Sequence, residues 1–372
     1  MSTSSNTTHH SCASTVTLCE AFWWTQRYQW LLRNGYRLQS NHNPVLDEKT
    51  RPKRSNNHSD PEREYVNYGT RLTDGKEVVL KRLTSPEDEQ ELALLDFLSQ
   101  EPLASDARNH CVPVLDTLLV PGDENTVVIV MPLLHSLGDA KLETIGDAVE
   151  LFHQLFEGVQ FLHDYRIAHR DISYGNVMYE TCRGRTRYYL IDFGLSRCYD
   201  LGSSPLEIHH EGTDFSVPEF STLQPYDPFP VDVYCLGNFL RHEFLETRTG
   251  FAFLRPLVQS MTQAESLRRP DIATAFKHLK ALTRDLPPRK LKSRSRQVDV
   301  KKRWSILSLA AALLQLILQL ILTLVFHWVP NARKILASWD SAKITAEHFA
   351  EPRRKPRWTD GVDIILYFCL GP

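Results

Sequence analysis

The chain has 372 residues, of which 24% are charged and 42% hydrophobic, an ordinary composition for a globular protein of one large or two ordinary domains. Its formal net charge of −2 gives no general attraction to nucleic acid, so nucleic acid is not an expected partner. The 7 cysteines form no C-x-x-C pair, which argues against a disulfide framework or a zinc site and favours a reducing compartment. No secretory signal is recognised at the N-terminus.

Residues 1–60 are expected to form an N-terminal extension that is partly disordered. Residues 1–19 are rich in Ser and Thr, while residues 22–36 are dense in aromatic side chains and are predicted to form a helix that packs on another part of the protein. Residues 40–63 are polar and contain prolines, as expected for a linker or a long loop.

From about residue 64 the pattern predicts two strands, EYVNYGTRL and KEVVLKRL, joined by a tight turn at residues 73–75. Residues 86–100 follow as a helix, with a proline and acidic residues in its first turn. Further along, the periodicity predicts strands at Val112–Leu119 and Thr126–Met131 and a helix at residues 143–164. Strands first and helices afterwards predict an α+β fold with two lobes.

The strongest functional signal is the segment His169-Arg170-Asp171-Ile172-Ser173-Tyr174-Gly175-Asn176, which fits the pattern H-R-D-x-x-x-x-N. Asp192-Phe193-Gly194 follows, with Asp192 sixteen residues after Asn176. Phosphoryl transfer needs a carboxylate that accepts the proton of the attacking hydroxyl, which suits Asp171, and Mg²⁺ prefers oxygen ligands, which suits Asn176 and Asp192. A lone D-F-G is often only a turn after a buried strand, but the order and spacing of the two motifs favour the catalytic interpretation.

These motifs resemble those of the protein kinase family, over about residues 61–285. The aromatic N-terminal segment and the form HRDISYGN are most similar to the kinase-like proteins of fungi, with a degenerate glycine-rich loop. The resemblance implies a small, mainly β N-lobe at residues 61–134 and a helical C-lobe at 135–285. It also implies ATP and Mg²⁺ as cofactors and a protein substrate that carries a hydroxyl group.

Further residues can be matched to the family one at a time. Val78-Val79-Leu80-Lys81 resembles V-A-I-K, which makes Lys81 the candidate that holds the α- and β-phosphates. Its expected partner is a glutamate of the next helix; Glu91 fits the spacing best, with Glu87 and Glu89 as rivals.

The nucleotide-binding candidates on the small lobe are Val66, which stands fifteen residues before Lys81, Met131 near the gatekeeper position and Leu134 in the hinge. Val217-Pro218-Glu219, Asp232-Val233-Tyr234-Cys235-Leu236-Gly237 and Arg269 resemble structural landmarks of the large lobe. Arg170 is counted with Asp171 and Lys81 among the candidate catalytic residues, and it is also a candidate partner for a phosphate placed on Ser203, Ser204, Thr213 or Ser216.

The chain departs from the family at the glycine-rich loop, where the three glycine positions hold Ser59, Pro61 and Glu64. Side chains there keep the backbone away from phosphates, so weak ATP binding is expected. Ser173 replaces the lysine usual in Ser/Thr kinases, so the substrate class is not readable. These departures leave two alternatives to an active protein kinase: a pseudokinase scaffold and a small-molecule phosphotransferase.

A membrane segment is predicted at residues 304–329, which contain no Asp, Glu, Lys or Arg. Its uncharged stretch Ile306–Phe326 has 21 residues, enough at about 1.5 Å per residue to span a bilayer core of roughly 30 Å. The flank at residues 286–303 is basic, which predicts a single-pass membrane protein with a cytosolic kinase domain and a C-terminal tail, residues 330–372, on the far side. The basic linker is also expected to contact anionic lipid.

Overall fold

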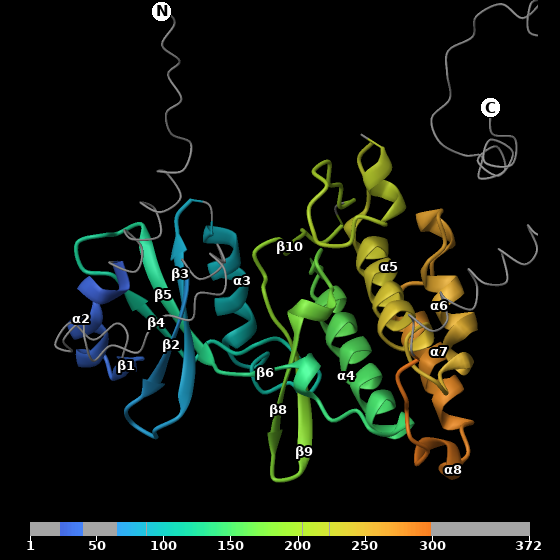
Figure 1. The fold of residues 1–372 in the computed structure, drawn as a ribbon. Helices are drawn as coiled ribbons and strands as arrows, with labels where there is room; N and C mark the ends of the chain where they lie inside the picture. Colours follow the sequence, from blue (N-terminus) through green and yellow to red (C-terminus); the bar gives the residue numbers. More distant parts are fainter. Residues whose placement is uncertain (1–22, 40–64, 87, 203, 223, 299–372) are drawn as a thin grey trace, which may run out of the picture. The chain divides into compact units, whose positions relative to one another are not determined.

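The structure is a computed structural model that describes residues 23–39, 65–86, 88–202, 204–222 and 224–298. The chain divides into two compact units, residues 1–298 and 299–372, and every described residue belongs to the first. In Figure 1 a twisted sheet together with α2 (Tyr28–Arg33) and α3 (Glu89–Ser99) forms the small lobe, and the large lobe is mainly helical. The expected α+β fold with two lobes is therefore confirmed.

The small lobe is built on a five-stranded antiparallel sheet in the order β1-β2-β3-β5-β4. Its elements are β1 (Tyr36–Leu38), β2 (Val66–Arg71), β3 (Glu77–Thr84), α3 (Glu89–Ser99), β4 (Asp116–Leu119) and β5 (Thr126–Pro132). The strand predicted from Val112 begins only at Asp116. Pro113 has no N–H to donate, and the N–H of Val112 bonds instead to the carbonyl of Leu190, 2.9 Å away.

The aromatic part of the predicted N-terminal extension, residues 1–60, packs on this lobe. Helix α2 (Tyr28–Arg33) precedes β1, and β1 pairs with β2 so that Tyr36 faces Arg71. Trp24, Tyr28 and Leu31 are buried in a hydrophobic cluster with side chains of β3, β4 and β5. The predicted packing of this segment is confirmed, and its partner is one face of the sheet.

Alternation along β3 explains how Lys81 reaches the opposite face of the sheet. Val78 and Leu80 lie in the cluster covered by the N-terminal segment. Because successive side chains of a strand point to opposite faces, Lys81 points away from that cluster and toward α3. Its ion pair with Glu91 of α3 is the direct evidence for this direction.

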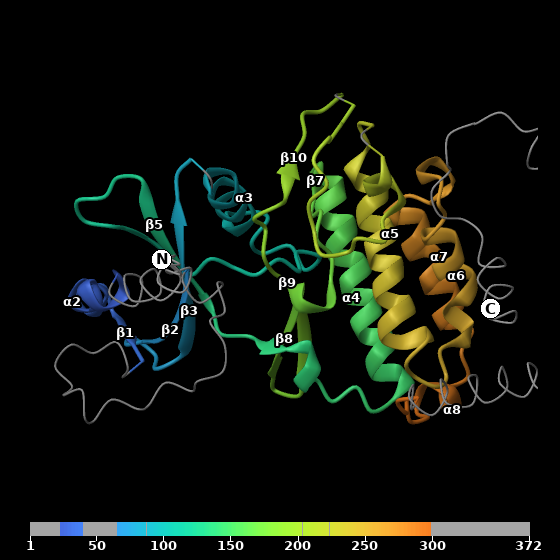
Figure 2. The same ribbon diagram turned by 45° about the horizontal axis from the view of Figure 1, so that its top comes forward.

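The large lobe is mainly helical, and Figure 2 shows α4, α5, α6 and α7 lying side by side. Its helices are α4 (Ile145–Asp164), α5 (Pro228–Leu240), α6 (Arg255–Met261), α7 (Ile272–Arg284) and α8 (Pro288–Leu291), and its strands are β6 (His135–Ser136), β7 (Ile167–Ala168), β8 (Val177–Cys182), β9 (Arg185–Leu190) and β10 (Arg197–Cys198). Thr144 and Asp147 form a capping box at the start of α4, so this helix begins within two residues of the predicted position.

Residues 293–298, here called the C-terminal strap, lie against the large lobe rather than in a free linker. The N–H of Ser295 donates to Glu143 at 2.8 Å, and that of Val298 donates to Thr247 at 2.7 Å. The folded lobe thus continues past residue 285, which corrects the predicted boundary of the basic linker. No helix within the described part of the chain is long and apolar enough to cross a membrane. The predicted segment 304–329 lies outside the described residues.

Candidate active site

Three charged side chains meet where the two lobes face each other. The Nζ of Lys81 on β3 lies 2.6 Å and 2.9 Å from the two carboxylate oxygens of Glu91 on α3. It also lies 3.2 Å from Oδ1 of Asp192, which follows β9 in the large lobe. Of the two rival glutamates, Glu89 is exposed and Glu87 lies outside the described residues. The structure therefore brings together Lys81, Glu91 and Asp192.

Burial and charge act against each other at this cluster. The Glu91 side chain is only 4% exposed, whereas that of Asp192 is 52% exposed. Burial on its own would lower the pKa of Lys81, but the carboxylates of Glu91 and Asp192 raise it above its ordinary value. Lys81 is thus held as a cation next to an exposed carboxylate, an arrangement suited to a multiply charged anion.

Asp171 and Asn176 lie together in the loop that follows β7. Nδ2 of Asn176 donates to Oδ2 of Asp171 at 2.8 Å and to the Asp171 carbonyl at 2.9 Å. The carbonyl of Asn176 in turn accepts from the N–H of Ile191 at 3.0 Å, so this loop is bonded to the residue that precedes Asp192. Asn176 and Asp192, the two predicted metal ligands, therefore lie in segments that are bonded to each other. The side-chain oxygen of Asn176 takes part in none of these hydrogen bonds.

The backbone of the catalytic loop is held by one buried carboxylate. Asp232 of α5 is fully buried and accepts the N–H groups of His169 at 2.8 Å and Arg170 at 2.7 Å. Nε2 of His163 lies 3.0 Å from the same carboxylate. Phe193 is also fully buried and lies beside the ring of His169, with centroids 5.0 Å apart. Asp232, predicted only as a landmark, fixes the direction of Asp171.

A threonine from a distant part of the chain contacts Asp171. Both the N–H and the hydroxyl of Thr213 donate to Oδ1 of Asp171, each at 2.7 Å. Gly212 permits this approach: its φ is +114°, and a Cβ there would lie 2.8 Å from the carbonyl of Arg170. The sequence suggested Thr213 only as a phosphorylation site; the Gly-Thr pair shortly before Val217-Pro218-Glu219 is the signal that was missed.

The guanidinium group of Arg170 pairs with two carboxylates of the segment that follows Asp192. Its side chain is 2% exposed and pairs with Glu207 at 3.2 Å and Glu211 at 3.3 Å. Both carboxylates belong to the segment between Asp192 and Glu219, where the sequence suggested a phosphate as the partner. Of the candidate acceptors for that phosphate, Ser203 lies outside the described residues.

The candidate nucleotide-binding side chains lie on the small lobe and the connection that leaves it. Val66 of β2 is directly opposite Lys81 in the sheet. Met131 lies on β5, opposite Val79 of β3, and Leu134 follows that strand. Met131 and Leu134 are partly buried against the large hydrophobic core. Ser59, Pro61 and Glu64 lie outside the described residues.

The predicted pair of Glu219 and Arg269 is present. Nη1 and Nη2 of Arg269 bind the two oxygens of Glu219 at 2.7 Å and 2.8 Å. Arg269 also donates to the carbonyls of Gln263 and Pro230. This pair ties the end of the segment that contains Thr213 to the helical lobe.

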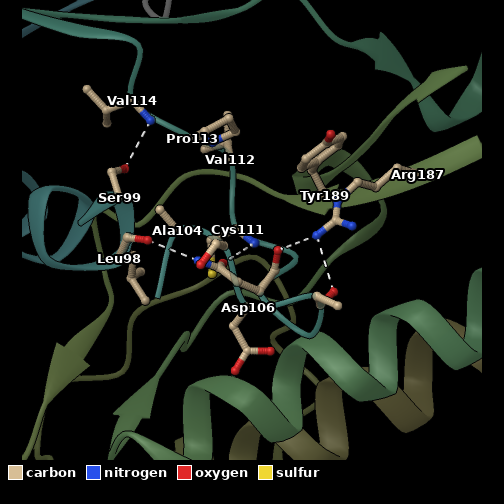
Figure 3. A pocket seen from close by; sticks show the side chains of 13 residues that line it. Leu98, Ser99, Ala104, Asp106, Cys111, Val112, Pro113, Val114, Arg187 and Tyr189 are labelled. Atoms are coloured by element: carbon tan, nitrogen blue, oxygen red, sulfur yellow. Dashed lines mark hydrogen bonds between the residues drawn. The ribbon is translucent and has the colours of Figure 1, made fainter. Parts of the chain in front are cut away.

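A cavity of about 400 Å³ lies elsewhere, between the end of α3, the loop that follows it, and β9. Figure 3 shows Leu98, Asp106, Cys111, Arg187 and Tyr189 around it. None of the residues that line it belongs to the cluster of Lys81, Asp171 and Asp192. The cavity is therefore separate from the candidate active site.

Comparisons with known proteins agree with this geometry. The family model for the protein kinase domain matches residues 65–314. The chain is 27% identical over 194 residues to the serine/threonine-protein kinase pim-2 of Danio rerio, covering 47% of this chain and 61% of that protein. It is 30% identical over 127 residues to the inhibitor of nuclear factor kappa-B kinase subunit alpha of Xenopus tropicalis, covering 34% of this chain and 16% of that protein.

Each match covers less than two thirds of the relative's own length, so the similarity concerns the shared domain and not the whole protein. A two-lobed fold with a lysine–glutamate pair and an H-R-D-x-x-x-x-N loop is the combination typical of one class of phosphotransferases. With a family model that matches 65–314, the chain belongs to the protein kinase family.

Proposed function

We propose that this protein is an ATP- and Mg²⁺-dependent protein kinase that transfers the γ-phosphoryl group to a hydroxyl side chain. The observation that carries the proposal is the link from Lys81 to both Glu91, at 2.6 Å, and Asp192, at 3.2 Å, across the two lobes. It assembles a cation and an exposed carboxylate beside the loop that holds Asp171.

The donor set fits Mg·ATP. Mg²⁺ is usually held by one or two protein oxygens together with waters and substrate phosphates, and Asn176 and Asp192 offer that many. Lys81 would bind the α- and β-phosphates, with Glu91 holding its ammonium group in place. Val66, Met131 and Leu134 would contact the base. When bound, Mg·ATP supplies the phosphoryl group to be transferred.

Asp171 would act on the acceptor. Its carboxylate accepts from Thr213 and Asn176, which fixes its orientation. It would receive the proton of the attacking hydroxyl as that oxygen binds the phosphorus, a role for which a positioned carboxylate is suited. Ser173 stands two residues on, so no lysine at that position contributes charge.

A pseudokinase scaffold is the second candidate, and the connection between β1 and β2 favours it. Residues 39–65, which join these two neighbouring strands, contain no glycine. Backbone N–H groups approach phosphates closely only where side chains are absent, so this connection would cover ATP poorly. A small-molecule phosphotransferase, suggested by Ser173, remains the third reading and predicts transfer to small hydroxyl compounds.

Nucleotide binding to the full-length chain tests the proposed Mg·ATP site, and phosphoryl transfer to protein or to small hydroxyl acceptors then separates the candidates. Calorimetric titration with Mg·ATP should show weak binding that Lys81→Ala reduces further. Glu64→Gly should tighten binding by removing a negative charge from a glycine position, and an unchanged affinity would count against that assignment. Complete absence of binding would favour the scaffold.

We further propose that residues 304–329 anchor the protein in a membrane with the kinase domain in the cytosol and residues 330–372 on the far side. The support is the uncharged run of 21 residues, Ile306–Phe326, and the basic flank before it. Within the strap and the residue before it, Lys292, Arg294 and Arg296 are exposed and alternate with half-buried Ser293 and Ser295. An anionic lipid surface would suit these cations.

Carbonate extraction tests the anchor. The wild-type protein should stay with membranes, and Leu316→Arg with Leu320→Arg should release it, since each central arginine costs about 2.5–3.5 kcal/mol of insertion free energy. Protease protection in sealed vesicles then reports the side of each end. Extraction of the wild type into the soluble fraction would contradict the proposed span.

A further inference from the structure

Arg170 is a buried cation that pairs with two carboxylates of the same chain. Besides its ion pairs with Glu207 and Glu211, its Nη1 donates to the carbonyl of Leu195 at 3.0 Å. A buried guanidinium needs compensating charge, and here two carboxylates provide it. The unmodified chain thus fills the position at which the sequence suggested a phosphate.

Glu207 is itself held firmly. Its Oε1 accepts from the hydroxyl of Tyr199 at 2.7 Å, while its Oε2 faces Arg170. Its backbone exchanges two hydrogen bonds with Tyr226, both 2.9 Å long. The hydroxyl of Tyr226 donates to the carbonyl of His209 at 2.7 Å. Residues 207–209 are therefore bonded through both backbone and side chains.

The same segment leads directly to the catalytic carboxylate. Glu211 precedes Gly212 and Thr213, and Thr213 donates twice to Asp171. Arg170 precedes Asp171, and its own backbone is bonded to Asp232. The ion pairs of Glu207 and Glu211 with Arg170 hold residues 207–211 next to the loop that carries Asp171. Thr213, two residues further on, then orients the Asp171 carboxylate.

We propose that Glu207 and Glu211 are positioning residues that order residues 207–213 in the unmodified chain, so that phosphoryl transfer does not depend on phosphorylation of this segment. Two carboxylates carry a charge of −2, comparable to the roughly −1.5 to −2 of a phosphate group at neutral pH. The inference rests on the proposed kinase function and adds how its active form is maintained.

The hydroxyl groups of this segment that lie nearest Asp171 are engaged in hydrogen bonds in the unmodified chain. Those of Thr213 and Ser216 already donate to Asp171 and Asp214. A phosphate on Thr213 would replace a donor to Asp171 with a negative charge, so modification there should inhibit transfer. Ser204 is exposed, so its modification need not disturb these bonds.

The test uses the full-length protein after phosphatase treatment, with mass spectrometry confirming that residues 203–216 are unmodified. Transfer from γ-labelled Mg·ATP to dephosphorylated casein is measured. The treated wild type and the double variant Ser203→Ala, Ser204→Ala should both match the untreated rate within about twofold.

The double variant Glu207→Gln, Glu211→Gln should lower kcat at least tenfold with little change in the KM for ATP. This is expected when charge-assisted hydrogen bonds that hold a catalytic loop are lost. Glu124→Gln with Glu180→Gln, a matched change at two exposed positions, should have no effect.

Hydrogen exchange of the Thr213 and Glu207 amides gives a readout that does not require activity. Protection should be lost in the Glu207→Gln, Glu211→Gln variant and kept in the matched control. If the wild type shows no transfer at all, the proposed function fails, and exchange alone decides the inference about the segment. A tenfold loss of wild-type rate on phosphatase treatment, or retained protection in the double variant, would overturn it.

Discussion

At the level of single residues, the candidate site brings together charged groups from distant parts of the sequence. The sequence predicted roles for Asp171, Asn176, Asp192, Lys81 and Glu91 from their spacing, because the motifs fix both residue type and order. Thr213 could not be assigned in the same way, since its contact with Asp171 joins residues 42 positions apart.

The first prediction concerns that threonine. Thr213→Val should lower phosphoryl transfer by about 10- to 100-fold, because a hydrogen bond to a charged group contributes roughly 1.5–3 kcal/mol. Thr213→Ser keeps the hydroxyl and should keep most of the activity. Steady-state rates for both variants check this, and equal loss in the two would show that the hydroxyl group alone does not account for the role of Thr213.

A second residue-scale prediction concerns the buried pair of Arg269 and Glu219. The side chain of Arg269 is fully buried and that of Glu219 is 11% exposed. Arg269→Ala leaves a buried carboxylate without its partner and should lower the free energy of unfolding by about 3–5 kcal/mol. Arg269→Lys should also destabilise, because an ammonium group lacks the forked geometry that binds both oxygens. Denaturant unfolding of the two variants provides the measurement; wild-type stability in Arg269→Ala would contradict it.

At the scale of elements, long periodic segments were predicted well and short ones were not. Helix α4 and strands β2, β3 and β5 have many residues whose pattern repeats, so their positions follow from the sequence. Strand β1 has only 3 residues, and it pairs with β2 across residues 39–65, so no local pattern reveals it. The sequence of the C-terminal strap likewise gives no local signal, because its ordered backbone depends on hydrogen bonds to the distant carbonyls of Glu143 and Thr247.

The N-terminal segment should contribute strongly to the stability of the small lobe. Trp24 is 1% exposed within the cluster on the sheet. Trp24→Ala should lower the free energy of unfolding by about 3–5 kcal/mol, the usual range for removing a buried large aromatic. Trp30→Ala, at a partly buried position of the same segment, should have a smaller effect. Thermal unfolding compares the two, and equal effects would mean that the burial of Trp24 is not what stabilises the lobe.

At the scale of the whole molecule, the two lobes are joined through the loop that carries His110. The carbonyl of His110 accepts from the N–H of Leu190 at 2.7 Å, and its Nδ1 lies 2.9 Å from the carbonyl of Tyr188. Glu157 lies 3.3 Å from its Nε2. Burial lowers the pKa of His110 below its ordinary value, and Arg187 acts in the same direction.

Because the fold favours the neutral ring, the unfolded chain binds the proton more readily, and stability should fall as the pH drops below about 6.5. His110→Gln should reduce the difference in melting temperature between pH 7.5 and pH 5.5. His135→Gln, at an exposed position, serves as the control and should leave that difference unchanged. The same pH dependence in wild type and His110→Gln would rule out this residue as a source.

The proposed kinase function depends on phosphoryl transfer directed by Asp171. Its carboxylate is half-buried and accepts three hydrogen bonds, so Asp171→Asn, which keeps one oxygen, is a better test than Asp171→Ala. The decisive measurement is transfer from γ-labelled Mg·ATP to a protein acceptor by full-length wild type and by Asp171→Asn. We predict measurable transfer by the wild type and a loss of at least about 100-fold in the variant, within the range for a general base. Equal rates in the two proteins, or no transfer by the wild type, would contradict the account.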